Sequence, residues 1–149
     1  MPGFDYLGWF AYSLTLVTRK RAKLFNEPDN VELALKALSK SLRCHGFTVH
    51  ANCFMPDHLH LLASGTDSSS LVRFTQHFKQ LSGYAYKKAT GEHLWQISFW
   101  DRVLRSDEDL EVVARYIWGN PVRAGLIQDS RLYPFSGPQP LPEVRWSRA

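Results

Sequence analysis

The chain has 149 residues, 44% of them hydrophobic and 13% aromatic, which is enough for one globular domain with its own core. Two cysteines, Cys44 and Cys53, are too few for a disulfide framework and lack zinc-binding spacing, so we expect both to be reduced and buried, as in a cytosol. No apolar run approaches the ~20 residues of a membrane span, and no signal peptide is predicted. The net charge of +4 is compatible with a polyanionic partner but does not require one.

Hydrophobic periodicity and turn residues predict four strands and three helices. Apolar residues at helical spacing mark the helices, and runs rich in aromatic and β-branched residues mark the strands. In chain order, the sequence predicts a strand at 9–18, a helix at 31–45, strands at 47–55 and 58–64, a helix at 71–89, a strand at 99–104 and a helix from 107 to about 119. This order predicts an α+β domain, with a ferredoxin-like, mainly antiparallel sheet and helices packed on it.

Local signals place several boundaries. Gly46 is expected to cap the first helix, a serine before residue 71 to cap the second, and Pro121 to stop the third. The predicted domain covers 1–133, and a proline-rich tail that is extended or poorly ordered covers 134–149. Because this tail offers no oligomerisation surface, a monomer is favoured over a homodimer.

Two histidines separated by one residue, His58 and His60, are the most informative feature of the sequence. Successive side chains of a strand point to opposite faces, so these imidazoles should project side by side, with Leu59 on the other face. Such a pair is either half of a metal site or two ordinary histidines on a half-buried strand.

The last predicted helix adds Tyr116 and Asn120, which lie four residues apart on one helix face. Taken separately, Tyr116 is an ordinary tyrosine at the edge of an apolar stripe, and Asn120 ends a helix before a proline. Combined with the histidine pair, they suggest phosphodiester chemistry. The two imidazoles and the amide oxygen of Asn120 would bind a cation, while Tyr116 attacks the phosphate in line and forms a phosphotyrosine.

Four motifs together resemble the HUH single-tyrosine transposases of the insertion-sequence 200/605 type, especially the REP-associated tyrosine transposases of bacteria. They span most of the chain in the family's order. The motifs are Met-Pro-Asp-His-Leu-His at 55–60, Leu-Trp-Gln-Ile-Ser-Phe-Trp-Asp-Arg-Val-Leu-Arg at 94–105, Tyr-Ile-Trp-Gly-Asn-Pro-Val-Arg-Ala-Gly-Leu at 116–126 and Tyr-Pro-Phe-Ser at 133–136.

The resemblance implies that His58 and His60 bind a divalent cation, Mg²⁺ or Mn²⁺. It implies that Tyr116 is the nucleophile, which forms a 5′-phosphotyrosine and frees a 3′-hydroxyl. Asn120 stands where a polar helix residue assists the metal, a place where insertion-sequence relatives more often have glutamine. Asp57 stands where many relatives have asparagine or glutamate. The implied fold is a ferredoxin-like sheet with helices, and the implied partner is single-stranded DNA with hairpins, such as REP-like repeats or transposon ends.

Basic and aromatic side chains supply what binding of single-stranded DNA needs. The expected phosphate contacts are Arg19, Arg21, Arg73, Lys79 and Arg123. Trp95, Phe99 and Trp100 would either stack on bases or pack in the core. Taken alone, each basic cluster is more simply a solvated face. Together with these features, the resemblance implies a DNA-nicking and strand-transferring enzyme of the bacterial cytoplasm that is associated with the nucleoid and binds no membrane.

Two other functions are compatible with the same residues. A catalytically silent regulator that binds DNA hairpins would keep the fold without the chemistry, and metal-dependent nicking of a hairpin oligonucleotide separates it from the enzyme. A metal-binding hydrolase of small phosphates would need a site that accepts substrates without a DNA groove, and the basic clusters make it the weaker alternative.

Overall fold

The computed structural model of the protein describes residues 10–66, 68–104 and 107–138. Its strands and α-helices occur in the predicted order, with a four-residue α-helix and a two-residue strand added near the C-terminal end. Within the described residues, three short 3₁₀ helices, at Arg19–Arg21, Leu24–Asn26 and Ser130–Leu132, lie between these elements. The elements are β1 (Phe10–Thr18), α1 (Pro28–His45), β2 (Thr48–Met55), β3 (His58–Gly65), α2 (Leu71–Thr90), β4 (Trp95–Leu104), α3 (Asp107–Trp118), α4 (Asn120–Arg123) and β5 (Ser136–Gly137).

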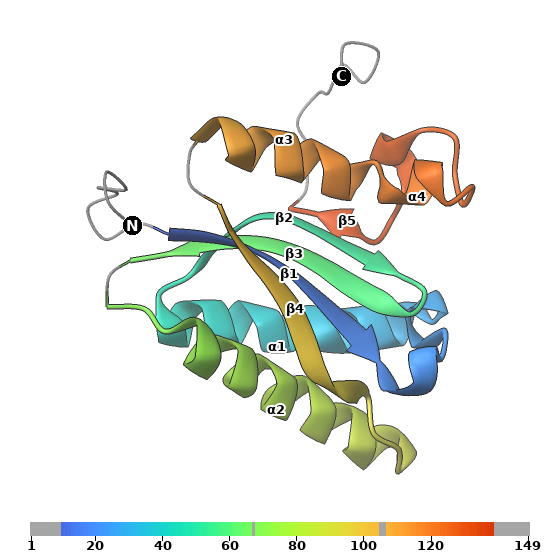
Figure 1. Ribbon diagram of the computed structural model, residues 1–149. Helices are drawn as coiled ribbons and strands as arrows, with labels where there is room; N and C mark the ends of the chain where they lie inside the picture. Colours follow the sequence, from blue (N-terminus) through green and yellow to red (C-terminus); the bar gives the residue numbers. More distant parts are fainter. Residues whose placement is uncertain (1–9, 67, 105–106, 139–149) are drawn as a thin grey trace.

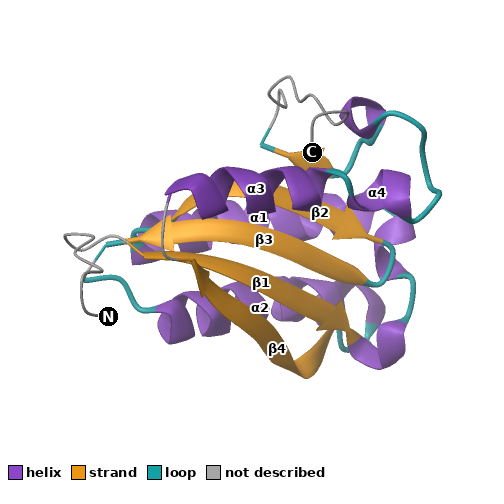
Figure 2. Ribbon diagram, turned by 45° about the horizontal axis from the view of Figure 1, so that its top comes forward, coloured by secondary structure: helices purple, strands orange, loops and turns teal. Residues whose placement is uncertain are grey.

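The strands form one sheet in the order β4-β1-β3-β2-β5, and every neighbouring pair is antiparallel. The chain order from β1 to β4 and the order of those four strands in the sheet make a ferredoxin-like arrangement, as the sequence predicted. Helices α1 and α2 cover one face of the sheet, and α3 lies across the other (Figures 1 and 2). Among the described helices, none combines the length and the apolar character needed to cross a bilayer.

Most local boundaries follow the predicted signals. Gly46 ends α1 in a left-handed conformation at φ 70°, which glycine adopts without the Cβ clash of other residues. The Ser70 side chain accepts a hydrogen bond from the backbone N–H of Arg73 and caps α2. The first helix begins three residues before the prediction, because Pro28 suits the first turn of a helix.

The last predicted helix ends within one residue of the predicted end at about Gly119, but Pro121 does not end the helical chain there. Helix α3 ends at Trp118, and after Gly119 the chain begins the short helix α4, in which Pro121 is the second residue. Proline is tolerated there because the N–H groups of a first helical turn have no partner within the helix. The break separates Tyr116 and Asn120, which the sequence placed on one continuous helix.

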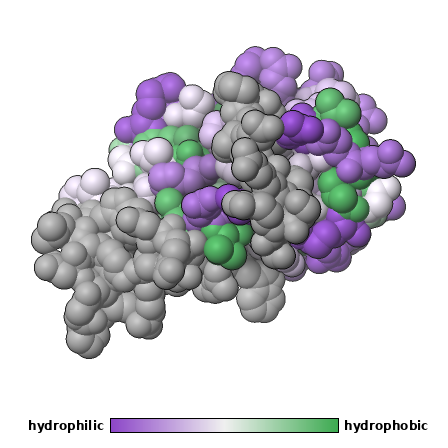
Figure 3. All heavy atoms as spheres, turned by 90° about the horizontal axis from the view of Figure 1, so that it is seen from above, coloured by the Kyte–Doolittle hydropathy of each residue, from purple (hydrophilic) through white to green (hydrophobic). Residues whose placement is uncertain are grey.

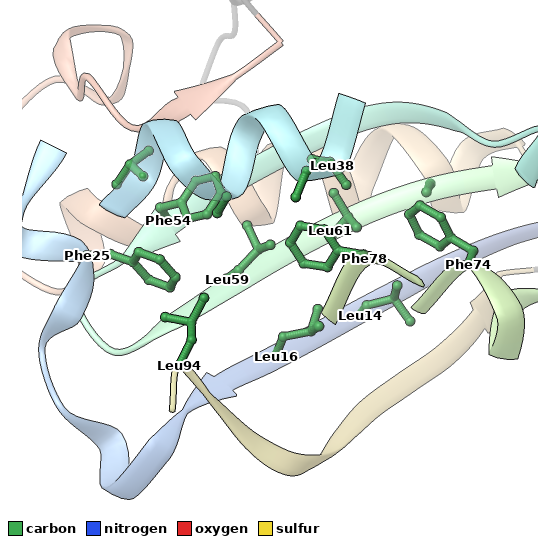
Figure 4. Packing of buried hydrophobic residues seen from close by; sticks show 14 of the residues in the cluster. Leu14, Leu16, Phe25, Leu38, Phe54, Leu59, Leu61, Phe74, Phe78 and Leu94 are labelled. Carbon is green, nitrogen blue, oxygen red and sulfur yellow. The ribbon is translucent and has the colours of Figure 1, made fainter. Parts of the chain in front are cut away.

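The larger core lies between the sheet and the α1–α2 pair (Figure 4). Leu59 and Leu61 of β3 are fully buried in it, as the predicted alternation requires. Trp95 belongs to this core as well, with its ring 5.7 Å from those of both Phe25 and Phe78. Trp95 is therefore a core residue, whereas the side chains of Phe99 and Trp100 lie outside the part that the structure describes.

A second, smaller core lies between the opposite face of the sheet and α3. Leu62 of β3 packs there with Val113, Ile117 and Trp118 of α3. Since side chains alternate along a strand, His58 and His60 share the face of Leu62. The histidine pair and the helix that carries Tyr116 therefore lie on the same side of the sheet.

The folded chain continues past residue 133, where the sequence placed the end of the domain. The Tyr133 hydroxyl donates a hydrogen bond to the carbonyl of Phe54 at 2.7 Å. Strand β5 pairs with β2, and the indole of Trp118 donates to the carbonyl of Gly137 at 2.8 Å. Residues 134–138 thus close the edge of the sheet beside β2, while the rest of the expected tail lies outside the described residues.

Candidate functional site

The two imidazoles of the His-x-His motif face each other on β3. Their Nε2 atoms are 3.1 Å apart, and their ring centroids lie 4.6 Å apart at 85°. Both side chains are half-buried. Two nitrogens that converge in this way leave one shared point in front of them, which a small cation could occupy.

Each histidine is held from behind through its other ring nitrogen. Nδ1 of His58 lies 2.7 Å from Oδ1 of Asp57, and Nδ1 of His60 lies 3.2 Å from Oγ1 of Thr15 on β1. An ionised carboxylate only accepts hydrogen bonds, so the Nδ1 of His58 is the donor to Asp57, and in the neutral imidazole the lone pair is then on Nε2. Histidines that bind metals are usually oriented by such a partner on their second nitrogen.

Burial and charge favour the forms of these side chains that a cation site needs. Burial, aided by the charges of His58 and Arg123, lowers the pKa of His60 to about 4, so this imidazole is neutral near pH 7. Partial burial acts to raise the pKa of Asp57, but the hydrogen bond and charge of His58 and the charge of Arg21 outweigh it and lower that pKa. The site thus combines neutral His60 with ionised Asp57.

Arg21 lies behind the histidine pair, where it contacts Asp57. Its Nε donates a hydrogen bond to Oδ2 of Asp57 at 3.1 Å. Lys20 and Arg21 have positive φ angles of 56° and 53°, a conformation that is uncommon outside glycine. The Thr18 hydroxyl ties this turn to the backbone carbonyl of Asp57 at 3.0 Å. The strained turn aims Arg21 at the carboxylate, so Arg21 supports the histidine pair through Asp57.

Tyr116 lies near the end of α3 with 57% of its surface exposed. The Arg123 guanidinium stacks on its ring, 3.8 Å from the centroid, and donates hydrogen bonds to the Tyr116 carbonyl and to Oδ1 of Asn120. The same guanidinium is near enough to His60 to lower its pKa. Arg123 therefore connects the tyrosine, the asparagine and the histidine pair.

Asn120 is partly committed to this arrangement. Its side-chain oxygen accepts from Arg123 at 2.6 Å, and its Nδ2 is buried without a hydrogen-bond partner in the described structure. A buried polar atom without a partner calls for a ligand, an ion or water. To bind a cation, Asn120 would use the second lone pair of its oxygen.

The remaining predicted phosphate contacts lie elsewhere. Arg19 is 3.6 Å from the carboxylate of Glu92, and Arg73 is exposed in the first turn of α2. Lys79, also on α2, donates to the backbone carbonyls of Gln96 and Ile97 at 2.7 and 2.9 Å. Helix α2 covers the face of the sheet away from α3 (Figure 1). The structure thus brings Arg21 and Arg123 to the histidine pair but places Arg73 and Lys79 on the other side.

Sequence reasoning missed Thr15 and gave little weight to Asp57. Asp57 could have been identified, because a carboxylate next to a candidate ligand is a local pattern. Thr15 carries no such signal, since only the pairing of β1 with β3 places it opposite His60.

Figure 3 views the molecule from the side of α3, where hydrophilic side chains border smaller hydrophobic patches on the described surface.

Residues 9–120 match the family described as "Transposase IS200 like". The chain belongs to this transposase family. It is 28% identical over 144 residues to a Haemophilus influenzae protein assigned as a REP-associated tyrosine transposase, and the match covers 89% of this chain and 81% of that protein. It is 24% identical over 131 residues to the REP-associated tyrosine transposase of Escherichia coli, covering 86% of this chain and 74% of the relative.

Two solved transposase structures share the fold. A REP-associated tyrosine transposase bound to a REP hairpin superposes with a TM-score of 0.70 at 23% identity, covering 87% of this chain and 76% of the other. A protein of Deinococcus radiodurans, also assigned as a transposase, gives a TM-score of 0.59 at 22% identity, covering 76% of this chain and 92% of the other. Family membership thus rests on the sequence, and these structures support the ferredoxin-like fold of the transposase.

Proposed function

We propose that this transposase is a metal-dependent endonuclease and strand-transferase that cleaves single-stranded DNA containing hairpins. The observation that carries the proposal is the convergence of the Nε2 atoms of His58 and His60, each backed by an oxygen on its other ring nitrogen. Hairpins are favoured as the substrate because one similar structure was solved with a REP hairpin and two relatives are assigned as REP-associated transposases.

The residues present fit a divalent cation. His58 and His60 would hold Mg²⁺ or Mn²⁺ through their Nε2 atoms, with Asn120 as the proposed third ligand. When bound, the ion would polarise the scissile phosphate and offset the charge that develops there. The neutral state of His60 and the carboxylate behind His58 both favour cation binding, because a protonated imidazole cannot be a ligand.

The proposed nucleophile is Tyr116. Its phenolic oxygen would form a bond to phosphorus as the bond from phosphorus to the 3′ oxygen breaks, which leaves a 5′-phosphotyrosine. The phenolic proton is lost, and the departing 3′ oxygen takes up a proton. Attack by the 3′-hydroxyl of another DNA end would reverse these changes, join the two strands and free the tyrosine. Arg123 would position the ring and place positive charge beside the phosphate.

The test is a labelled single-stranded hairpin oligonucleotide incubated with Mn²⁺ or Mg²⁺ and resolved on a denaturing protein gel. We expect a covalent band with the wild type, lost on chelation and lost in Tyr116→Phe. Circular dichroism and hairpin binding should be unchanged in that variant, because Tyr116 is largely exposed. A covalent band that persists in Tyr116→Phe would contradict the proposal. Tight binding of several hairpins without reaction would favour the silent regulator.

A further inference from the structure

A groove of about 400 Å³ lies between the second half of α2 and the start of β4. Helices α2 and α3 lie on opposite faces of the sheet (Figures 1 and 2). Since His58 and His60 share the α3 face, the groove beside α2 lies away from them. The side chains and backbone that matter here are those of Lys79, Gly83, Tyr84, Lys87, His93 and Ile97. We call this feature the α2–β4 groove.

The α2–β4 groove combines apolar surface with positive charge. Tyr84 is 70% exposed and Ile97 is 97% exposed, although both are large and hydrophobic. Lysines 79 and 87 and His93 also line the groove, and none of the described residues that line it is acidic. A flat aromatic surface beside basic groups is what a nucleotide of single-stranded nucleic acid requires, because the base can stack while the phosphate meets the cations.

The groove is open and its walls are held in place. A Cβ added at Gly83 would meet no atom within 4 Å, so the floor is clear along this part of α2. Lys79 donates to the carbonyls of Gln96 and Ile97, and Ser82 accepts from the indole of Trp95 at 2.8 Å. These bonds join α2 to β4 across the groove, so little ordering would be needed when a ligand binds.

We propose that the α2–β4 groove binds one nucleotide of single-stranded DNA, with the base against Tyr84 and Ile97 and the phosphate facing Lys87 and His93. This inference rests on the proposed function, because it takes DNA as the partner, and it adds a contact on the face opposite the histidine pair. DNA that reaches both places must pass around the edge of the sheet. The groove would therefore hold a flanking segment away from the scissile phosphate.

The sharpest test fills the groove without removing any group. Gly83 lies inside α2, where leucine is a better helix former, so Gly83→Leu should fold at least as well as the wild type. We expect Gly83→Leu to bind a fluorescent oligothymidylate about tenfold more weakly than the wild type does. Tyr84→Ala should weaken binding to a similar extent, because it removes the stacking surface. Ala89→Leu is the matched control, since it adds the same side chain to an exposed position of α2 that does not line the groove.

A second measurement locates the base. Photocross-linking with an oligonucleotide that contains 5-iododeoxyuridine, followed by peptide mass spectrometry, should place a cross-link on Tyr84. Wild-type affinity in both Gly83→Leu and Tyr84→Ala would overturn the inference, while a metal-dependent covalent band at Tyr116 would leave the proposed function standing. Loss of self-association in Gly83→Leu with unchanged DNA affinity would also overturn it and mark a protein interface. Groove-dependent binding with no covalent band on any hairpin would support the groove and contradict the nuclease.

Discussion

At the scale of single residues, the chemistry of the site depends on side chains that hold other side chains. Asp57 fixes the proton of His58 on Nδ1 and is itself held by Arg21. Arg123 fixes Tyr116 and Asn120 and acts on His60 through its charge. The histidines and the tyrosine are thus positioned by neighbours that would touch neither the metal nor the attacking oxygen.

Replacing Asp57 should weaken cation binding without disturbing the fold. Asp57→Asn removes the charge that holds the Nδ1 proton of His58, and we expect Mn²⁺ affinity to fall about 10–100-fold, the usual effect of losing such a partner. This affinity is measured by titrating the protein with Mn²⁺ and recording the electron paramagnetic resonance signal of the free ion. Asp129→Asn is the control, because that carboxylate pairs with Arg131 on the surface. Equal Mn²⁺ affinity in the two variants would contradict the role of Asp57.

Arg123→Lys separates positioning from simple attraction to phosphate. Lysine keeps the positive charge but lacks the planar group that stacks on Tyr116 and reaches Asn120. If Arg123 positions the tyrosine, single-turnover cleavage should slow by about tenfold or more while hairpin affinity changes little. A pure phosphate contact predicts near-normal cleavage in Arg123→Lys and weaker hairpin binding in Arg123→Gln, and that pattern would argue against positioning.

At the scale of elements, two short segments shape the site face. Helix α4 turns the chain after Gly119 and brings Arg123 back over Tyr116. Strand β5 pairs with β2, with Ser136 opposite Cys53. Burial raises the pKa of the Cys53 thiol to about 11, although a hydrogen bond with Ser136 and the charge of Arg123 act to lower it. Cys53 is therefore protonated and, as predicted, covered, whereas Cys44 is exposed, so the prediction that both cysteines are buried is wrong for Cys44.

The two thiols should react at different rates. Only the thiolate is nucleophilic, so near pH 8 we expect iodoacetamide to modify Cys44 readily and Cys53 only after unfolding. Mass spectrometry of the native protein should find one label per chain, and the denatured protein should take two. Ser136→Ala keeps β5 but removes the hydroxyl and should leave this pattern unchanged. Rapid labelling of Cys53 in the native protein would show that the β2–β5 edge does not cover it.

At the scale of the whole molecule, the sheet separates two faces with different features. The α1–α2 face contains the larger core and the α2–β4 groove, and the α3 face carries the histidine pair and Tyr116. Residues 134–138 complete the second face by adding β5 beside β2 and by receiving the Trp118 indole on Gly137. The stability of the site face should therefore depend on the C-terminal segment.

Two truncations measure that dependence. One chain would end after Pro138 and the other after Tyr133, so their difference isolates 134–138. The shorter chain loses the β2–β5 pairing and the packing of Phe135, and we expect urea denaturation to find it less stable by about 2–3 kcal/mol. Equal stability of the two chains would mean that the domain already ends at 133, as the sequence suggested.

What the sequence by itself determined is the set of features that recur within a few residues. The alternation of side-chain direction along a strand placed His58 and His60 on one face, with Leu59 and Leu61 on the other. The order of helices and strands predicted the ferredoxin-like sheet. These features are local, because backbone geometry repeats every two or 3.6 residues and needs no distant partner.

Only the tertiary structure decided which distant residues meet. The register of β1 on β3 placed Thr15 behind His60, the turn after Gly119 laid Arg123 on Tyr116, and β5 extended the fold past residue 133. It also divided the predicted phosphate contacts between two faces of the sheet. These outcomes depend on packing between segments far apart in the chain, whose residues carry no periodic signal of their partners.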